Sequence, residues 1–465
     1  MRSKKAALAV VCMFLLAACG ARLTNAQRLA GIRAISRAGG GGGSQTTGTT
    51  GLGGPGATGT TGTGLPGGTS GIGAPGAIVP SAPPGGNGGA TDVGVTGNQI
   101  TLAVASDVTG VQAGLFKSTF QAMQALAAMV NSQGGIYGRG IKLLLLDTKA
   151  DSVANQAAVR QACDNAFALV GSMSAFDNGG AATGEACGIP DVSAITVNPE
   201  RAEAKNVYPA EPIGPHNFAI GTANYIKRTY GDTVIKNAAL LYLNAGVTRV
   251  NAAQRRKAYE SVGFNYRMYQ QVEVLEPNYA PFVQKMKDLG IQYVNMVANY
   301  QAIQKLLSAM DQVGYYPKVR DWDSVAYSQN FLTEGAPANG SIVFLNTAIY
   351  EEVSTNPEMQ TYVQWLNRVA PGAKPDYFGF YAWSAGRLFM KVHQMVGPKI
   401  TRKAFLAAVK TVHSWDDYGM HAAHDIGNKV VSPCFMYLEI KNQKFVRRAP
   451  AGKGWICNMG GIIRT

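Results

Sequence analysis

The sequence lacks the short motifs by which several classes of enzyme can be recognised. It has no G-x-S-x-G, which would present a serine nucleophile on a sharp turn, no P-loop for phosphates, and no H-E-x-x-H zinc motif. The nearest approach to a metal cluster is His421, His424 and Asp425, in a segment punctuated by Gly and Asn, and such spacing alone is weak evidence for a metal site. We therefore predict a protein that is not an enzyme and that needs no metal and no cofactor.

The sequence also lacks a basic run interleaved with aromatic residues, which would indicate a nucleic-acid-binding face. The formal net charge is +14, but seven Lys and Arg residues lie in the first 37 positions, where there is no Asp or Glu. By subtraction the remainder carries +7. We predict no nucleic-acid partner and interpret the residual charge as general surface character near a membrane or cell wall.

The hydrophobic stretch at the start of the chain is short. A basic start with Arg2, Lys4 and Lys5 is followed by an apolar core over residues 6–18, which is the pattern of an export signal. This core is shorter than the ~20 residues that a membrane-spanning helix needs, although an uncleaved membrane anchor remains the alternative. Residues 16–20, LAACG, resemble the lipobox of bacterial lipoproteins. The resemblance implies a lipoprotein signal peptide over residues 1–19, with lipid attached to Cys19.

Residues 20–92 have little that could form a core. From Gly39 onward they are mostly Gly, Thr, Pro, Ser and Ala without a strict collagen-like triplet, so they cannot bury enough apolar surface to offset the entropy of ordering. We predict a disordered tether, and a linker of about fifty residues spans on the order of 40 Å.

Cysteines are few. If Cys12 leaves with the signal and Cys19 takes the lipid, four remain: Cys163, Cys187, Cys434 and Cys457. An even number in an exported chain suggests disulfides, and proximity in the sequence favours Cys163 with Cys187 and Cys434 with Cys457. Metal binding lacks the support of a C-x-x-C pair, and buried free thiols remain possible.

The stretch over residues 100–147 predicts a strand, a turn, a helix and a second strand. Residues 100–106 are apolar, residues 107–114 have turn chemistry, and apolar residues then recur every three or four positions from Phe116 to Val130. Residues 141–146 are apolar throughout, as a strand covered on both faces must be. This order implies a parallel pair with a right-handed crossover, and ligands bind at the carboxyl ends of such strands. Asp107 and Thr109 are therefore candidate site residues.

The rest of the chain continues to alternate strands and helices, which predicts an α/β protein. We expect strands over residues 166–170, 189–194, 238–243, 265–274, 293–297 and 324–327, with helices over 152–166, 225–230, 247–262, 282–289 and 302–313. About 370 residues follow the tether, more than one core usually accommodates, so two lobes are expected.

Four motifs, taken in order, resemble one family over residues 98–440. The most specific is NSQGGIYGRGIK at 131–142, which is similar to the family's N-x-x-GGI-x-G-x-x-IK turn. The others are LVG at 169–171, GIP at 188–190 and FYA at 380–382. The family is that of the type I periplasmic solute-binding proteins, and the resemblance is closest to its branched-chain amino acid (leucine/isoleucine/valine) branch.

This resemblance implies two Rossmann-like lobes with parallel sheets, joined by three crossovers. Lobe 1 would comprise residues 93–217 plus 346–425, and lobe 2 residues 218–345 plus 426–465. The implied function is that of a lipid-anchored, extracytoplasmic monomer that closes on a small organic solute, an amino acid or related compound, and delivers it to the permease subunits of an ABC importer. The alternative is a sensor component that presents its closed form to a membrane receptor, and a scaffold that has lost its ligand is a third possibility.

The resemblance also implies where the solute is held. In the family, the loops after the third and fourth strands bind the ligand's carboxylate, and the matching positions here are Ser174, Ala175 and Phe176, then Ile195 and Thr196. Phe176 would supply an apolar wall and Asp177 a partner for a cation. From the second lobe, the residues at predicted strand ends are Tyr242, Asn244, Asn299, Tyr300 and Tyr327.

One position departs from the family pattern. Amino-acid binders carry a second-lobe acid that pairs with the ligand's ammonium group, and the best alignment places Val325 there, with Asp323 two residues before it. The class of solute is therefore left open. The cysteines depart as well, since the family's early disulfide includes a residue near Ala150, whereas here Cys163 lies further along the helix.

Overall fold

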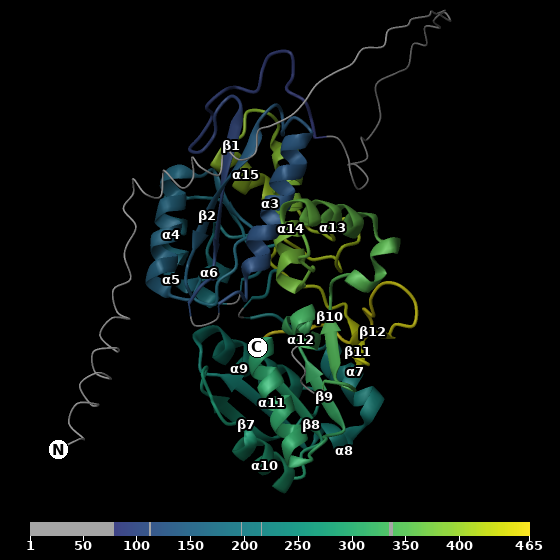
Figure 1. Ribbon diagram of the computed structural model, residues 1–465. Coiled ribbons are helices and arrows are strands. Elements are labelled where there is room, and N and C mark those ends of the chain that lie inside the picture. Colours follow the sequence, from purple (N-terminus) through teal and green to yellow (C-terminus); the bar gives the residue numbers. More distant parts are fainter. Residues whose placement is uncertain (1–78, 111–112, 197, 215, 334–337) are drawn as a thin grey trace, which may run out of the picture. The chain divides into compact units, whose positions relative to one another are not determined.

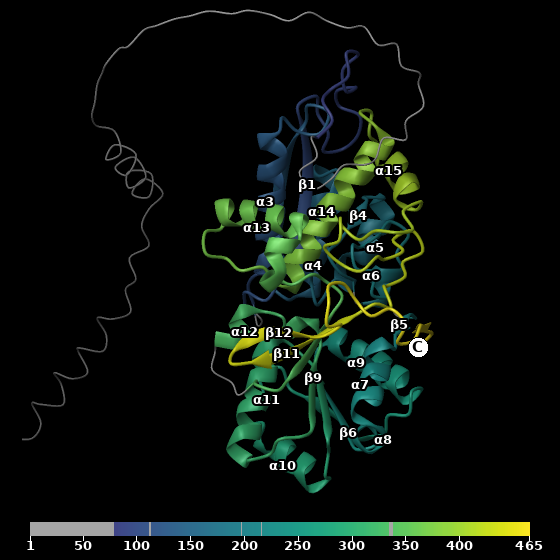
Figure 2. The same cartoon turned by 90° about the vertical axis from the view of Figure 1, so that its right-hand side faces the viewer.

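The computed structural model describes residues 79–110, 113–196, 198–214, 216–333 and 338–465. The predicted signal peptide, the predicted lipid attachment site Cys19 and most of the predicted tether lie outside these residues. Within them, no helix is both long enough and apolar enough to span a membrane. Secondary structure alternates between strands and helices around two main sheets, and a third sheet has only two short strands, so the α/β prediction is confirmed (Figures 1 and 2).

The first sheet has four strands in the order β2-β1-β3-β4 and is parallel throughout. β1 and β2 pair from Gln99 with Gly140 to Ser106 with Asp147, as expected for the opening strand, helix and strand. Successive residues of β1 face opposite sides: Leu102 and Val104 pack in the cluster that contains α3, whereas Ala103 packs with α4. The elements around this sheet are β1 (Gln99–Ser106), α3 (Lys117–Ser132), β2 (Gly140–Asp147), α4 (Ser152–Asn165), β3 (Ala168–Val170), α5 (Asn178–Cys187), β4 (Asp191–Val192) and α6 (Pro199–Glu203).

The second sheet has seven strands in the order β12-β11-β10-β9-β8-β6-β7. The strands from β10 to β7 are parallel to one another, and β11 and β12 add to the edge of β10 in antiparallel pairs. The elements around this sheet are α7 (Gly221–Tyr230), α8 (Asp232–Ile235), β6 (Ala238–Leu243), α9 (Gly246–Glu260), β7 (Tyr266–Val272), α10 (Ala280–Asp288), β8 (Tyr293–Val297), α11 (Tyr300–Val313), β9 (Val319–Trp322), η1 (Ser324–Ala326), α12 (Gln329–Thr333), β10 (Ile342–Leu345), β11 (Met436–Lys441) and β12 (Lys444–Ala449). Two short strands, β5 (Phe218–Ala219) and β13 (Ile462–Ile463), pair with each other in a separate antiparallel sheet.

The chain returns to the first sheet between β10 and β11. The long, buried helix α14 packs against α3 and the strands β3 and β4, and α13 and α15 lie beside it (Figure 2). The 3-10 helix η2 packs against α13. The bounds of these helices are Tyr350–Thr355 for η2, Pro357–Val369 for α13, Tyr377–Val396 for α14 and Arg402–Val409 for α15. The chain then leaves for the second sheet again through β11 and β12. The two lobes are thus built from discontinuous parts of the sequence.

Three strand predictions need correction. Residues 324–327 are not a strand, because β9 ends at Trp322 and Ser324–Ala326 form a 3-10 turn. The strand predicted at 189–194 is reduced to Asp191–Val192. β2 is covered less completely than predicted: α3 and α4 contact it and its leucines pack on both faces, but it is an edge strand in which Lys142 is exposed and three of its leucines are half-buried.

Both predicted disulfides are present. Cys163 pairs with Cys187, linking α4 to α5, and Cys434 pairs with Cys457, with Cα atoms 6.1 and 4.1 Å apart respectively. The second closes a loop of 23 residues beside the antiparallel bridge of Phe435 with Ile456. The alternatives of a metal site or free thiols do not apply to these four cysteines.

The folded part of the chain begins before the predicted start at residue 93. Val79 is buried, and the carbonyls of Asn87 and Gly89 accept hydrogen bonds of 2.7 and 2.8 Å from Arg139 Nη2. Arg139 is fully buried and also donates to the carbonyls of Thr96 and Pro398 at 2.7 and 2.6 Å. The prediction of a tether up to residue 92 is therefore wrong for residues 79–92, because a cationic side chain of the GGI turn fixes their backbone.

Candidate functional site

A cavity of about 180 Å³ lies at the carboxyl ends of strands from both sheets. From the first sheet it is lined by Phe116 after β1, Ala175 after β3 and Ile195 after β4. From the second it is lined by residues that follow β6, β8, β9 and β10, among them Ala245 and Asn299. A cavity of this size holds on the order of ten water molecules, which is room for a small organic molecule. The prediction that ligands meet the carboxyl ends of the strands agrees with this placement.

The walls of the cavity are mostly apolar. The apolar lining residues come from both sheets and from the segments that cross between them: Leu115, Phe116, Met173, Ala175, Ile195, Ile213, Phe218, Ala219, Leu243, Ala245, Val247, Val297, Ala298, Val325, Phe344, Phe378, Val431 and Phe435. Among the polar lining residues, Glu211, Arg255 and Asp323 carry ionisable groups that can be charged near neutral pH. Apolar walls with a few convergent polar groups are the usual composition of a small-molecule site.

Three of the thirteen predicted ligand residues line this cavity: Ala175, Ile195 and Asn299. Asn299 also caps α11, since its Oδ1 accepts from the amide of Ala302 at 2.9 Å. The other ten are not among the lining residues. Their contacts show what each does instead.

Asp107 holds the loop after β3 to the loop after β2. Its carboxylate accepts from Ser174 Oγ at 2.9 Å, from the amide of Ala175 at 2.8 Å, from the amide of Ala150 at 3.1 Å and from the hydroxyl of Thr148. The hydroxyl and the amide predicted to hold a ligand's carboxylate are therefore bonded to a carboxylate of the protein itself. Ser174 Oγ in turn accepts from the amide of Phe176 at 3.0 Å, which closes the loop.

The remaining first-lobe candidates are also bonded within the protein. Thr109 Oγ1 donates to Asp147 at 2.5 Å, and Thr196 Oγ1 donates to the carbonyl of Ile213 at 3.3 Å. Asp177 is buried and accepts from Asn198 Nδ2 at 2.6 Å. Burial raises the pKa of Asp177 to about 7. Phe176 is half-buried against the core.

The other second-lobe candidates lie away from the cavity wall. Tyr242 packs on Tyr269 with ring centroids 4.9 Å apart, and the Nδ2 of exposed Asn244 lies 3.1 Å from both carboxylate oxygens of Glu273. The hydroxyl of buried Tyr327 donates to Glu351 at 2.7 Å. A hydrogen bond from Asn330 Nδ2 to the hydroxyl of Tyr300, 3.5 Å long, places Tyr300 beside α12.

An ion pair that the sequence did not predict occupies the second-lobe side of the cavity. Arg255, on α9, donates from Nη2 to Asp323 at 3.0 Å and from Nη1 to Asn295 Oδ1 at 2.9 Å. Its guanidinium lies 6.0 and 5.5 Å from the ring centroids of Phe218 and Phe344, within the range of cation–π attraction. The acid missing at Val325 is thus present at Asp323, but it is paired with an arginine of the protein.

A second unpredicted residue, Glu211, lies on a segment that crosses from the first sheet to the second. It is 2% exposed, and its carboxylate accepts from Asn346 Nδ2 at 2.6 Å and from the hydroxyl of Tyr377. Burial raises the pKa of Glu211 to about 7, although these two hydrogen bonds oppose the shift. Nothing in the local sequence marks Glu211 or Arg255, because neither lies at a predicted strand end.

The histidine segment does not form a metal site. Asp425 Oδ1 lies 2.9 Å from His413 Nδ1, whereas His424 Nε2 lies 2.9 Å from the hydroxyl of Tyr381. His421 Nε2 lies 2.8 Å from Ser384 Oγ. Burial lowers the pKa of His421 to about 4 and that of His424 well below its usual value, so both rings are neutral. In the part of the chain that the structure describes, no three His, Cys, Asp or Glu side chains could hold a metal ion.

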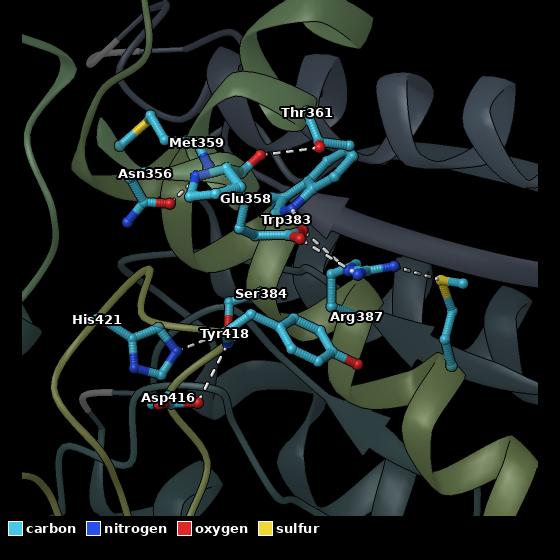
Figure 3. A network of polar contacts seen from close by, with 12 residues as sticks. Asn356, Glu358, Met359, Thr361, Trp383, Ser384, Arg387, Asp416, Tyr418 and His421 are labelled. Carbon is cyan, nitrogen blue, oxygen red and sulfur yellow. Dashed lines mark hydrogen bonds and ion pairs between the residues drawn. The ribbon is translucent and has the colours of Figure 1, made fainter. Parts of the chain in front are cut away.

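Figure 3 shows the polar network that surrounds His421. The buried carboxylate of Glu358 accepts from Trp383 Nε1 at 2.7 Å and pairs with Arg387 Nε at 2.9 Å. This network joins α13, α14 and the segment after α15 that carries Asp416, Tyr418 and His421, and none of its members lines the cavity. It stabilises the packing of the first lobe.

A family model described as "Periplasmic binding protein" matches residues 99–444. A comparison with curated proteins gave no match. Among solved structures, a fatty acid ABC transporter substrate-binding protein from Thermomonospora curvata is similar with a TM-score of 0.67 at 17% identity, over 80% of this chain and 97% of that one.

Two further structures are similar to the same extent. A branched-chain amino acid transporter substrate-binding protein from Streptococcus pneumoniae, in complex with isoleucine, has a TM-score of 0.64 at 12% identity, over 77% of this chain and 99% of that one. A solute-binding protein of an ABC transporter from R. palustris, in complex with 4-hydroxybenzoate, has a TM-score of 0.63 at 15% identity, over 75% of this chain and 95% of that one. At such identities these likenesses show the fold.

Proposed function

Because the chain belongs to the periplasmic binding protein family, with the type I fold, we propose that it is the solute-binding component of an ABC importer and closes its lobes on a small organic solute. The family consists of binding proteins, and the chain is accordingly not an enzyme. The observation that carries the proposal is the mostly apolar cavity at the carboxyl ends of strands from both sheets. A solute in this position contacts both lobes at once, so binding favours the closed form.

The proposed lobes are residues 93–217 plus 346–425 and residues 218–345 plus 426–465, with residues 79–92 added to the first. Three segments of this division cross between the sheets, and each contributes to the cavity. Asn217 lies at the first crossing, Asn346 at the second, and Val431 follows the third. Side chains at hinges that also line the cavity would couple the position of the lobes to the presence of a solute.

The proposed ligand contacts combine predicted and unpredicted residues. Ala175, Ile195 and Asn299 are kept from the sequence-based set because they line the cavity. Glu211 and Asp323 are added because they are its acidic lining residues. Asp107 and Ser174 are proposed to support the loop that carries Ala175 rather than to touch the solute.

The family implies an extracytoplasmic location, and we propose that a lipid on Cys19 holds the protein at the outer face of the cell membrane. The supporting pattern is the LAACG sequence after a basic, apolar start. In this arrangement the protein works as a monomer with the permease subunits. Changing Cys19→Ser should move the protein from the detergent phase to the aqueous phase in a detergent partition, and an unchanged distribution would refute the anchor.

A thermal-shift screen tests solute binding itself. Amino acids, amides, aromatic acids, primary amines and small sugars are added separately to the purified domain, residues 79–465. A ligand at a hundredfold excess over its Kd should stabilise the native state by about 2.7 kcal/mol. A folded protein that no compound stabilises would contradict the proposal.

A further inference from the structure

The polar part of the cavity wall contains buried hydrogen-bond acceptors that have no partner among the described residues. The Oδ1 atoms of Asn251, Asp323 and Asn346 are buried and have no hydrogen-bond partner among the described residues. Asn346 and Asp323 are 2% and 9% exposed, and all three residues line the cavity. A buried acceptor without a partner is costly, so these atoms indicate that a ligand supplies the missing donors.

The hydroxyl groups of the cavity also present lone pairs. Thr248 Oγ1 lies 2.5 and 2.9 Å from the carbonyl oxygens of Leu243 and Ala245, which share its one hydrogen, and Ser324 Oγ donates to the carbonyl of Phe344 at 2.9 Å. Each hydroxyl has a single hydrogen, which is used in these bonds. A solute that approaches these oxygens must therefore bring the hydrogen itself.

Two of the donors predicted to hold a carboxylate, and the cation of the cavity, are already engaged. Ser174 Oγ and the amide of Ala175 donate to Asp107. Arg255 lies between two aromatic rings and is paired with Asp323, and its Nε is the one guanidinium nitrogen without a partner among the described residues. A ligand carboxylate would thus face Glu211 and Asp323 with no uncompensated cation near them, and burying an unpaired charge is unfavourable.

The charges of the lining residues also favour a solute with a positively charged donor group. The positive charge of Arg255 balances the negative charge of Asp323, so the lining residues carry a net charge of one negative unit when Glu211 is ionised. A primary ammonium group carries one positive charge and three hydrogens, which match one ionised carboxylate and neighbouring neutral acceptors. Asn346 is directly bonded to Glu211, so one unpartnered acceptor is adjacent to the carboxylate.

Resting on the proposed solute-binding function, we propose that the cavity selects a primary amine with an apolar body and no carboxylate, and that Glu211 is the residue that receives its ammonium group. The apolar body lies against the aliphatic and aromatic walls around Ile195 and Phe344. The assignment excludes free α-amino acids, because their carboxylate would lie in a cavity that contains Glu211 and Asp323 and whose one cation, Arg255, is already paired with Asp323.

Isothermal titration with matched compounds tests the assignment. Hexylamine, 1-hexanol, hexanoate and norleucine share one apolar chain, and 2-phenylethylamine, 2-phenylethanol, 3-phenylpropanoate and phenylalanine share another. The amine of at least one series should bind about tenfold or more tightly than its alcohol, acid and amino-acid partners, as expected for a charge-assisted contact. Tighter binding of an acid or amino acid would overturn the assignment and leave solute binding intact. Absence of binding by both amines would also overturn it, and the broad screen would then decide whether solute binding falls too.

Glu211→Gln separates the charge from the shape of the site. This variant should weaken the amine about tenfold or more and leave the weak binding of the alcohol unchanged, whereas the exposed control Glu200→Gln should change neither. Equal amine affinity in the Glu211 variant would refute the role of this residue.

The pH profile supplies a second readout. The titratable groups that face Glu211 are Tyr377 and Tyr381 on α14, with Asp323 and Arg255 across the cavity. Tyr377 and Tyr381 have pKa values raised well above the usual value by burial, so they stay neutral between pH 6 and about 8. Amine affinity should rise over this range in the wild type as Glu211 ionises, and it should be flat in Glu211→Gln. A wild-type profile that falls or stays flat would count against the assignment.

Discussion

Replacing Asp107 by asparagine tests the proposed support of the loop after β3. In the wild type, one carboxylate oxygen accepts from the amide of Ala175 at 2.8 Å, and the other accepts from the hydroxyls of Thr148 and Ser174 and the amide of Ala150. The Oδ1 of an asparagine can still accept the hydrogen bonds from Thr148, Ser174 and Ala150. Its Nδ2 would then face the amide of Ala175, so two donors would meet in a buried position.

The expected cost follows from these bonds. Loss of a hydrogen bond to a charged acceptor costs about 1.5–3 kcal/mol, and a buried donor left without a partner costs about 1–3 kcal/mol. Since the two estimates partly describe the same loss, we expect Asp107→Asn to lower the free energy of unfolding by about 3 kcal/mol. The exposed residue Asp164 on α4 is the matched control, and Asp164→Asn should change the free energy by less than about 0.5 kcal/mol.

Urea denaturation followed by tryptophan fluorescence measures both variants. The midpoint for Asp107→Asn should fall clearly below those of the wild type and of the control, with a similar slope. A loss of less than about 1 kcal/mol would refute the reasoning, because it would mean that the carboxylate does not hold the loop.

Three further predictions concern stability. Cys434→Ser should lower the free energy of unfolding by about 3 kcal/mol, since the disulfide closes a 23-residue loop, and an unchanged denaturation midpoint would contradict this. Burial raises the pKa of Glu211 to about 7, so between pH about 4 and 7 the folded state holds a proton that the unfolded state has lost. The stability that this proton contributes is complete below pH about 4 and is lost as the pH rises through 7. Glu211→Gln should remove up to about 3 kcal/mol of this pH dependence, and identical thermal profiles at pH 5 and 8 for variant and wild type would contradict it. Arg139→Lys should release residues 79–92 to faster proteolysis, because lysine cannot reproduce the four bonds to carbonyls; equal cleavage rates would show that other contacts suffice.

The order of strands and helices could be predicted because most elements have a clear hydrophobic period. The strand β9 could not, since Arg320 and Asp321 interrupt its apolar pattern. Asp321 is buried in the folded protein because the hydroxyl of Tyr293, on the neighbouring strand β8, donates to it at 2.7 Å. Such a partner cannot be predicted before the sheet is assembled, so the sequence pattern places the strand at the residues after Asp323 instead.

The site was predictable to the extent that it lies at strand ends. The resemblance predicts Ala175 and Ile195 in the loops after the third and fourth strands, and the end of a predicted strand gives Asn299. Glu211 lies on a crossing segment and Arg255 in the middle of a helix, and they line the cavity only because the chain passes between the two sheets three times. The long-range bond of Asp107 to the loop after β3, which uses up the predicted carboxylate donors, is likewise a property of the folded protein.

Blocking the cavity tests the central claim most directly, namely that this cavity is where the protein binds its solute. Val325 is half-buried on the cavity wall, and Val313 is half-buried at the end of α11 away from it. The compound that gives the largest thermal shift is titrated into the wild type and into Val325→Trp and Val313→Trp. We predict that Val325→Trp lowers the affinity about tenfold or more, because the indole fills the space, while Val313→Trp binds as the wild type does. Equal affinity in all three proteins would contradict the account.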